Sequence, residues 1–304
     1  MPASPSATAE HIKDVNTRYH DVAAPSYDAK WGIDYGEVGR AQVRAKLVKA
    51  LGHEPPEPFG DALEIGAGTG YFSLNLAQLG LIERSTATDI SNGMLGALSG
   101  TARRLGVAVE AVRAEAEALP FDDASFDLVF GHAVLHHIPD LDRAFGEFGR
   151  VLRPGGVVAF CGEPSRHGDR LAAVPKRAGR LLGPAWRRLL GAAASNGVEA
   201  GHEDCHDLEP EVDVHAFTPS DLRRHLDAGG FESARIQGEE LLANLWGWTL
   251  RSLESTADPD QVPQRWRQFA FRSYIALQRV DAGLLEPRLP PQLFYNLMLS
   301  ASRP

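Results

Sequence analysis

The chain is poor in cysteine, in net positive charge and in long apolar runs, and each shortage excludes a class of protein. Of its 304 residues, Cys161 and Cys205 are the two cysteines, too few for a disulfide framework. The 31 Lys and Arg residues are outnumbered by 40 Asp and Glu, a net charge of −9. This excess of acid argues against a DNA-binding protein, because such proteins need a basic face. No run long enough to span a bilayer and no basic start before an apolar stretch is visible, so we expect a cytoplasmic protein with no stable membrane insertion.

Between residues 60 and 163, strand-like and helix-like segments alternate. Strands separated by helices are typical of βαβ units, whose parallel sheet is buried on both faces. The expected strands cover 61–65, 84–89, 107–114, 126–134 and 156–163, and the expected helices cover 71–79, 91–106 and 140–152.

The flanking segments depart from this alternation. A helix is expected over 36–51, ended by the proline-rich run that follows, and another over 218–231; strands are expected over 232–240 and 293–301. The expected divisions are a disordered tail (1–10), N-terminal helices (11–59), a core (60–163), an Arg-rich insert (164–216) and the C-terminal part of the core (217–304), which carries a helical insert at 241–286.

The most informative stretch is LEIGAGTG, Leu63 to Gly70, a strand that runs into three alternating glycines. Glycines let the backbone approach a ligand that side chains would block. A dinucleotide fingerprint would need its third glycine at position 71, where Tyr71 stands, and the carboxylate of Glu64 would repel a nearby phosphate. These departures weigh against a nicotinamide oxidoreductase, whereas a cationic ligand would tolerate Glu64.

Two acidic residues follow the next strands. Asp89 ends the second expected strand, where a carboxylate can accept hydrogen bonds from both ribose hydroxyls. Glu115 follows the third, where it can accept from the exocyclic amine of adenine. With the glycines, these acids indicate a nucleoside pocket at the carboxyl edge of the central strands.

Five stretches, in order, resemble the class I S-adenosylmethionine-dependent methyltransferases, close to the small-molecule enzymes of ubiquinone and menaquinone biosynthesis. They are LEIGAGTG (63–70), TDISNGML (88–95), AEAEALPFDDASFDLV (114–129), VLHHIPD (134–140) and LRPGG (152–156). The resemblance implies an α/β fold with a Rossmann-like, doubly wound, seven-stranded and mostly parallel sheet, an N-terminal helical lid over 11–59 and two mainly helical inserts that form the acceptor side. It also implies S-adenosyl-L-methionine as the cofactor and an activity of the EC 2.1.1 class.

The resemblance further assigns the cofactor-binding residues, with one departure: Glu115 stands where family members usually have Asp. The assigned residues are Glu64, Gly66, Ala67, Gly68, Thr69 and Gly70 around the methionine moiety, Asp89 at the ribose, Ile90, Met94, Glu115 and Ala116 around the adenine, His132 where cofactor and acceptor meet, and Tyr19 and Tyr27 in the lid.

Catalysis by such an enzyme depends first on alignment. A sulfonium is already a strong electrophile, and positioning contributes roughly 7–11 kcal/mol, whereas a general base adds about 10²–10⁴-fold. The candidate bases are His132, His136 and His137. We therefore expect in-line methyl transfer to a small, hydrophobic acceptor, mainly through positioning; the alternatives are a non-catalytic cofactor-sensing module and a methyltransferase that acts on protein or RNA.

Three features lie outside the shared pattern. His202 and His206 are four residues apart, but no second ligand cluster accompanies them, so a solvated loop is favoured over a metal site. Trp246, Trp248 and Phe271 are core residues or line an acceptor pocket or a homodimer contact. The basic residues of the first insert form either a solvated helical face or a surface that attracts an acidic or membrane-bound substrate.

Overall fold

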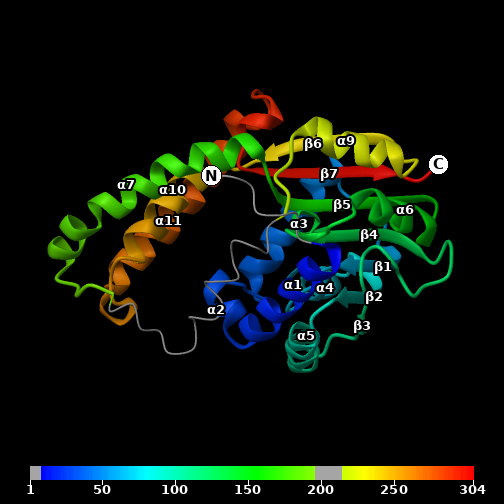
Figure 1. Ribbon diagram of the computed structural model, residues 1–304, viewed down its shortest axis with the longest axis horizontal. Helices are drawn as coiled ribbons and strands as arrows, with labels where there is room; N and C mark the ends of the chain where they lie inside the picture. The colour runs from blue at the N-terminus through cyan, green and yellow to red at the C-terminus, as the bar shows by residue number, and fades with distance from the viewer. Residues whose placement is uncertain (1–7, 196–213) are drawn as a thin grey trace.

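A computed structural model describes residues 8–195 and 214–304, and its centre is a seven-stranded sheet with the strand order β3-β2-β1-β4-β5-β7-β6 (Figure 1). Strand β7 runs antiparallel to both of its neighbours, and the other adjacent pairs are parallel. The strands are β1 (Phe59–Ile65), β2 (Ile82–Asp89), β3 (Glu110–Arg113), β4 (Phe126–His132), β5 (Leu152–Pro164), β6 (Glu232–Glu239) and β7 (Asn296–Ser302). The predicted mostly parallel sheet of seven strands is confirmed.

Helices cover both faces of the sheet, so its central strands are buried on both sides. In β1, Leu63 and Ile65 pack into one apolar core, which includes Phe145 and Phe148, while Ala62, the residue before Leu63, joins the other. This alternation is the period-two geometry of a strand with two buried faces. The helices of this part are α3 (Glu37–Leu51), α4 (Tyr71–Gln78), α5 (Asn92–Leu105), α6 (Leu141–Val151) and α9 (Pro219–Ala228).

Local capping explains where several of these helices begin. Ser91 Oγ accepts from the N–H of Met94 at the start of α5, as its position in the sequence indicates. Thr218 and Asp221 form a reciprocal capping box at the start of α9. Strand β5 begins earlier than expected because Leu152 already pairs with Phe126.

The N-terminal segment is helical from Ala9 onward. It forms α1 (Ala9–Ala23), the 3₁₀ turn η1 (Ala24–Ser26) and α2 (Tyr27–Trp31). Thr8 caps α1 by accepting from the N–H of His11, so Ala9 and Glu10 are helical although the sequence predicted a disordered tail as far as residue 10. The prediction is wrong at these two residues because Thr8 caps the helix, whereas a composition rich in small residues suggested disorder.

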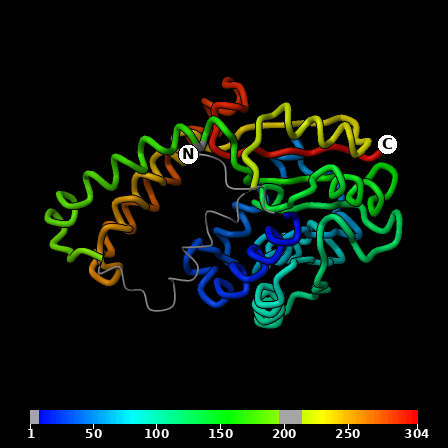
Figure 2. The backbone as a smooth tube through the Cα atoms, in the orientation of Figure 1, coloured from blue at the N-terminus to red at the C-terminus, as the bar shows by residue number. Residues whose placement is uncertain are grey.

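The two inserts pack against each other beside the sheet, although they are far apart in the sequence (Figures 1 and 2). Helix α7 (Arg166–Leu190) follows β5, whereas α10 (Leu242–Glu254) and α11 (Gln264–Val280) lie between β6 and β7. Buried Asp281, in the π turn η4 (Asp281–Leu285), accepts from the N–H groups of Leu242 and Ala243 and so caps α10. Within the described ranges, no helix combines the length and apolarity needed to cross a bilayer.

Candidate functional site

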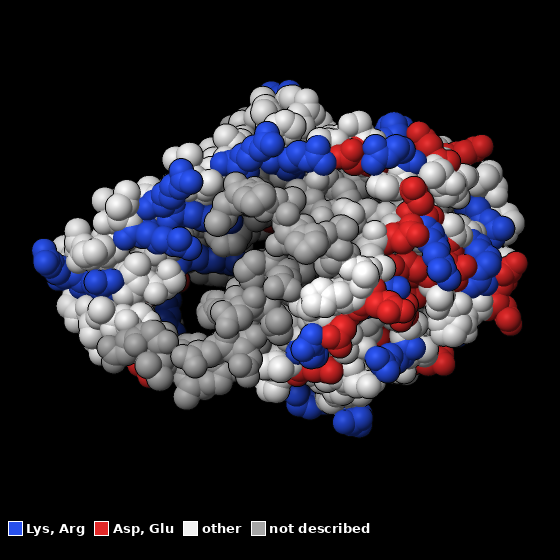
Figure 3. Space-filling view, viewed as in Figure 1, with Lys and Arg blue, Asp and Glu red and all other residues white. Residues whose placement is uncertain are grey.

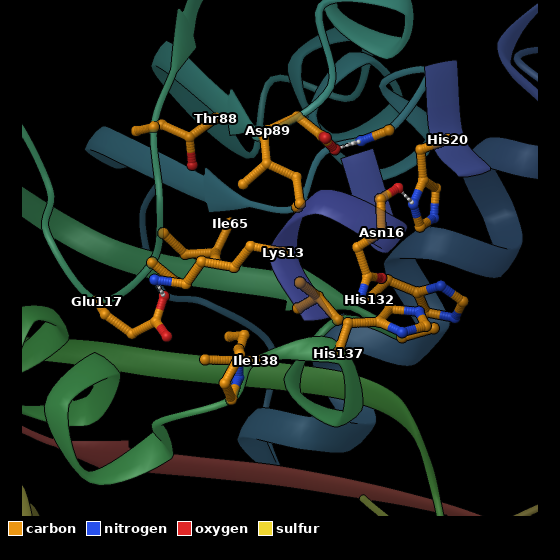
Figure 4. Close-up of a pocket in the computed structure, with 18 of the residues that line it drawn as sticks. Lys13, Asn16, His20, Ile65, Thr88, Asp89, Glu117, His132, His137 and Ile138 are labelled. Carbon is orange, nitrogen blue, oxygen red and sulfur yellow. Dashed lines mark hydrogen bonds and ion pairs between the residues drawn. The ribbon is translucent and has the colours of Figure 1, made fainter. Parts of the chain in front are cut away.

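A cavity of about 760 Å³ opens at the carboxyl ends of β1, β2 and β4, under helix α1 (Figure 4). This is the edge at which open α/β sheets bind ligands. Its lining residues are Lys13, Asn16, His20, Tyr27, Ile65, Gly66, Gly68, Thr88, Asp89, Ile90, Ala114, Ala116, Glu117, His132, Ala133, Val134, His137, Ile138 and Pro139.

The glycine loop forms the floor of this cavity with a left-handed backbone. Gly66 has φ 60°, and a Cβ on it would lie 2.2 Å from Cγ2 of Val134. Gly68 has φ 53° and lines the cavity, with open space where its Cβ would stand. Neither position accepts a larger side chain without strain or loss of ligand space.

Asp89 presents a buried carboxylate to the same cavity. Its Oδ2 accepts from the N–H of Gly68 and its Oδ1 from the N–H of Ser91, both at 2.9 Å. Burial raises the pKa of Asp89, and the neighbouring His20 and the backbone N–H donors oppose this rise only in part. A carboxylate has about four acceptor positions, so these bonds leave capacity for a further donor such as a ribose hydroxyl.

Helix α1 covers the cavity with polar side chains that the sequence analysis did not single out. Lys13, Asn16 and His20 lie on one helix face and line the cavity. Figure 4 shows Lys13 reaching Glu117, with its Nζ 3.1 Å from Glu117 Oε2; the same Nζ lies 2.7 Å from Oε2 of Glu115. The spacing of Lys13, Asn16 and His20, three and four residues apart, is the sequence signal that could have predicted this polar face. The apolar stripe of α1 overlaps these positions and obscured the pattern.

The other end of α1 is fixed to α5. Asp21 Oδ1 accepts from Ser91 Oγ at 2.6 Å and from the N–H of Gly93 at 2.8 Å. A carboxylate at a helix N-terminus is favourable because unpaired N–H groups and the helix dipole meet it there. Helix α1 is therefore held at both ends over the cavity.

The two predicted lid tyrosines have different positions. Tyr27 lines the cavity and packs with Ala23, Ala24 and Met94, and burial raises its pKa. Tyr19 is buried within the lid, and its hydroxyl accepts from Lys30 Nζ at 3.3 Å.

Several other predicted cofactor residues lie behind the cavity surface rather than on it. Met94 is fully buried, Gly70 is the N-cap residue of α4 with φ 91°, and Thr69 accepts from the hydroxyl of Tyr35 at 3.2 Å. The residues of the prediction that line the cavity are Tyr27, Gly66, Gly68, Asp89, Ile90, Ala116 and His132, and those absent from its lining are Tyr19, Glu64, Ala67, Thr69, Gly70, Met94 and Glu115.

Glu64 is buried behind the glycine loop, where its Oε2 accepts from the N–H of Ser73 at 3.0 Å. Complete burial raises the pKa of Glu64 to about 8. The carboxyl is therefore mostly protonated at neutral pH, and the repulsion of phosphate that the sequence suggested is weaker than expected.

The three candidate bases have different surroundings. His132 stacks on Phe72, with ring centroids 4.9 Å apart, and burial lowers its pKa to about 3. His136 is buried, and its Nδ1 lies 2.9 Å from Oε2 of Glu163. His137 lines the cavity, with its ring 5.6 Å from that of His20.

Glu163 is a fully buried residue that the sequence analysis missed. Besides bonding His136, its oxygens accept from the N–H groups of Val134, Leu135 and His136 at 2.9, 3.1 and 3.2 Å. These bonds hold the turn η2 (Leu135–His137), which carries His137 to the cavity. Glu163 ends the fifth predicted strand, and no local pattern distinguishes it from a surface acid.

A second cavity lies between α10 and α11. Trp248 and Phe271, both predicted as possible acceptor-pocket residues, line it together with Tyr274 and Arg251. Trp246 does not line it; its indole Nε1 donates to Ser273 Oγ at 2.8 Å. His202 and His206 lie outside the described residues.

Comparisons with known proteins agree with this geometry. A methyltransferase domain model matches residues 63–160. The chain is 33% identical to malonyl-[acyl-carrier protein] O-methyltransferase of Methylococcus capsulatus, over 72% of this chain and 78% of that protein. It is 35% identical to demethylmenaquinone methyltransferase of Roseiflexus castenholzii, over 53% of this chain and 63% of that protein.

The fold is also found among solved structures. Phosphoethanolamine N-methyltransferase 2 of Haemonchus contortus, solved with S-adenosylhomocysteine, superimposes with a TM-score of 0.60 at 16% identity. The alignment covers 98% of this chain and 60% of that one. At that identity the likeness shows the fold.

The cavity fits S-adenosylmethionine in its own right. The open space at Gly68 admits a ligand close to the backbone, and the Asp89 carboxylate lines the cavity, where it can accept from a hydroxyl donor. The apolar walls include Ile90 and Ile138, which suit an adenine ring. The chain is 33% identical to the Methylococcus capsulatus enzyme and spans more than two thirds of it. It therefore belongs to the class I S-adenosylmethionine-dependent methyltransferases, enzymes of the EC 2.1.1 class, with S-adenosyl-L-methionine as its cofactor.

Proposed function

We propose that this methyltransferase acts on a small, largely apolar acceptor that lies between the cofactor cavity and the α10–α11 insert. The observation that carries the proposal is the aromatic cavity in that insert, lined by Trp248, Phe271 and Tyr274. Aromatic walls with a few polar groups are typical of small-molecule sites. The name of one relative supports an apolar acceptor, since it specifies demethylmenaquinone, whereas the name of another specifies a malonyl group on an acyl-carrier protein.

Aromatic contacts connect the two cavities. The ring of Tyr27, which lines the cofactor cavity, lies 6.2 Å from that of Trp31. The guanidinium carbon of Arg251 lies 5.4 Å from the ring centre of Trp31 and 5.5 Å from that of Trp248. An acceptor on this path would contact aromatic rings and the guanidinium of Arg251 between the insert and the cofactor cavity.

A buried ionic network holds the insert against the sheet. Glu240 accepts from the hydroxyl of Tyr274 at 2.6 Å and lies 3.7 Å from Lys46 Nζ. Lys46 and Lys49 both pair with Glu239. Burial by itself would raise the pKa of Glu239, but the two ammonium groups outweigh it and lower the pKa to about 2. The paired charges fix the wall of the proposed acceptor site.

Catalysis in this proposal rests on alignment. The cofactor, when bound, supplies a methyl group already activated by its sulfonium. The glycine loop and Asp89 orient the nucleoside, while α1 excludes water from above. Positioning of this kind contributes roughly 7–11 kcal/mol.

Where the acceptor must lose a proton, we assign that proton to His137. A general base must come within hydrogen-bond reach of the proton that it abstracts, and His137 lines the cavity. His132, with a pKa of about 3, is a poor base and serves as a neutral wall of the cavity. His136 pairs with Glu163 and holds the turn that presents His137.

The acceptor class is tested by following a labelled methyl group. The protein is incubated with methyl-labelled S-adenosylmethionine and a cell extract, and the product is divided into solvent-extractable, protein and RNA fractions. The proposal expects label in the extractable fraction, directly or after hydroxylamine has cleaved carrier-protein thioesters. Label that stays with protein after hydroxylamine, or with RNA, would favour a macromolecular acceptor instead.

The pocket is tested with two matched phenylalanines of α11. Phe271 lines the second cavity and Phe269 does not, although they are 54% and 50% exposed. Phe271→Ala should raise KM for the acceptor about 3- to 10-fold, as expected for the loss of one aromatic contact, and leave S-adenosylhomocysteine affinity unchanged. Phe269→Ala should change neither. Equal KM values for the two variants would place the acceptor elsewhere.

A further inference from the structure

The outer face of α7 carries a row of apolar side chains that the described structure leaves exposed. The exposed fractions reach 82% at Leu181 and 83% at Leu189. Val174, Leu182 and Leu171 follow with 69%, 58% and 43%. At about 100° per residue, these five side chains fall within an arc of roughly 100°, so they form one continuous stripe along the helix.

A basic row runs beside this apolar stripe. Arg166, Arg170, Arg177 and Arg188 are all exposed and lie within an arc of about 40°. Seven Lys and Arg residues and one acidic residue stand between positions 166 and 190, in a chain whose net charge is −9. Figure 3 shows the basic side chains gathered along the bundle, whereas acidic and basic ones mix over the sheet.

The inner face of α7 fixes this orientation. It is made of small residues that lie directly on α10 and the turn after it: a Cβ on Gly179 would stand 2.5 Å from Cβ of Ser252, and one on Gly183 would stand 2.6 Å from Thr256. Trp186 completes the contact in a cluster with Leu253. Because the backbone of α7 at these glycines contacts the side chains of Ser252 and Thr256, a rotation of α7 that buried its leucines would cause a steric clash.

We propose that the outer face of α7 binds the surface of an anionic lipid bilayer, with the leucines entering the acyl boundary and the arginines contacting lipid phosphates. A helix with Leu on one face and Arg beside it has the composition of an interfacial helix, and long basic side chains reach headgroups from that depth. The stripe runs along a helix of about 38 Å at the outer edge of the molecule in Figure 1, which suits a flat surface. A second copy of the chain fits less well, since it would bring one row of arginines against another.

The binding is peripheral and independent of the proposed acceptor. It uses side chains that do not line either of the two cavities described above. A test of binding therefore requires no methyl acceptor, and the two proposals can fail separately.

The experiment is flotation of the full chain with vesicles of phosphatidylcholine alone or of an equal mixture with phosphatidylglycerol. We expect binding to the mixed vesicles, weakened by salt because the attraction is partly electrostatic, and much weaker binding to phosphatidylcholine. Binding to neither vesicle, or equal binding to both, overturns the proposal.

Two pairs of variants test the rows. Leu181→Ser with Leu189→Ser, and separately Arg170→Gln with Arg177→Gln, should each weaken binding to mixed vesicles about tenfold. The matched controls are Leu284→Ser with Leu293→Ser and Arg265→Gln with Arg272→Gln, exposed residues outside α7, and they should bind normally.

Unchanged S-adenosylhomocysteine affinity and circular dichroism show that a variant is folded. Vesicle binding retained by folded α7 variants contradicts the proposal. A concentration-dependent dimer that the leucine variant abolishes, or capture of an acidic protein without vesicle binding, assigns the face to a protein partner instead.

Discussion

The sheet core and the bundle of α7, α10 and α11 both contain helices with aromatic side chains, but these side chains are buried to different degrees in the two regions. Phe145 and Phe148 of α6 are fully buried against the sheet, whereas Phe269 and Phe271 of α11 are about half exposed. The core helix has a sheet beneath it, and the bundle helix contacts other helices along part of its surface. Substitutions in the core should therefore affect folding and cofactor binding together, whereas substitutions on the bundle surface should affect recognition alone.

The largest contrast should come from two left-handed glycines. Gly66→Ala forces a Cβ against Val134, while at Gly191, which ends α7 with φ 69°, an added Cβ meets nothing within 4 Å. We expect Gly66→Ala to lower the free energy of unfolding by about 2–5 kcal/mol and to abolish measurable S-adenosylhomocysteine binding. Gly191→Ala should cost about 1–2 kcal/mol and leave binding intact. Urea unfolding and calorimetry measure both, and equal losses would mean that the glycine loop is no more constrained than a helix end.

The next contrast concerns the buried carboxylate at the end of β2. Asp89→Ala removes the acceptor proposed for the ribose hydroxyls and should weaken S-adenosylhomocysteine binding about 100-fold or more, because hydrogen bonds to a charged group are each worth about 1.5–3 kcal/mol. Asp258→Ala, beside the bundle, should leave that affinity unchanged. Normal affinity in Asp89→Ala would contradict the assignment of the ribose site.

The buried acid behind the loop predicts a pH effect. With a pKa of about 8 in the folded protein, Glu64 holds its proton after the unfolded chain has lost it near pH 4.5. Wild-type stability relative to Glu64→Gln should therefore fall as pH rises from 4.5 to about 8, by roughly 2 kcal/mol between about pH 5 and pH 7. Urea unfolding of both proteins across this range measures the difference. A constant difference would show that Glu64 is ionised in the folded state.

The smallest effect is expected at the anchor of the lid. Asp21→Ala removes the acceptor for Ser91 Oγ and the N–H of Gly93 and should weaken S-adenosylhomocysteine binding about 3- to 10-fold. Amide exchange in α1 should become faster. The control is Asp14→Ala on the exposed face of α1, which pairs with Arg18 and should have no effect on binding. Equal affinities for the two variants would mean that α1 stays closed without this anchor.

Much of the core could be predicted because its signals are local. The glycine loop, the cap at Ser91 and the capping box at Thr218 each depend on residues within four positions of one another. The order of strands and helices along the chain follows from the spacing of apolar residues, which is also a local pattern. Such local signals can be interpreted without the tertiary structure, since they act through the backbone geometry of neighbouring residues.

The missed residues share a different property. Lys13 meets Glu117 across more than a hundred positions, and His136 meets Glu163 across 27. Nothing near Glu163 in the chain distinguishes a buried acid that holds a turn from an exposed one. Its role became visible once β5 placed it beneath the turn after β4.

The chain alone was sufficient to specify the α/β class, the S-adenosylmethionine fingerprint and the position of Asp89, because each rests on short-range geometry and on the edge at which parallel strands end. Folding in three dimensions was needed to decide that α1 closes the pocket, that Glu64 is largely uncharged and that α7 turns its leucines outward. Burial and long-range pairing determine those properties, and both depend on which distant segments come to lie together.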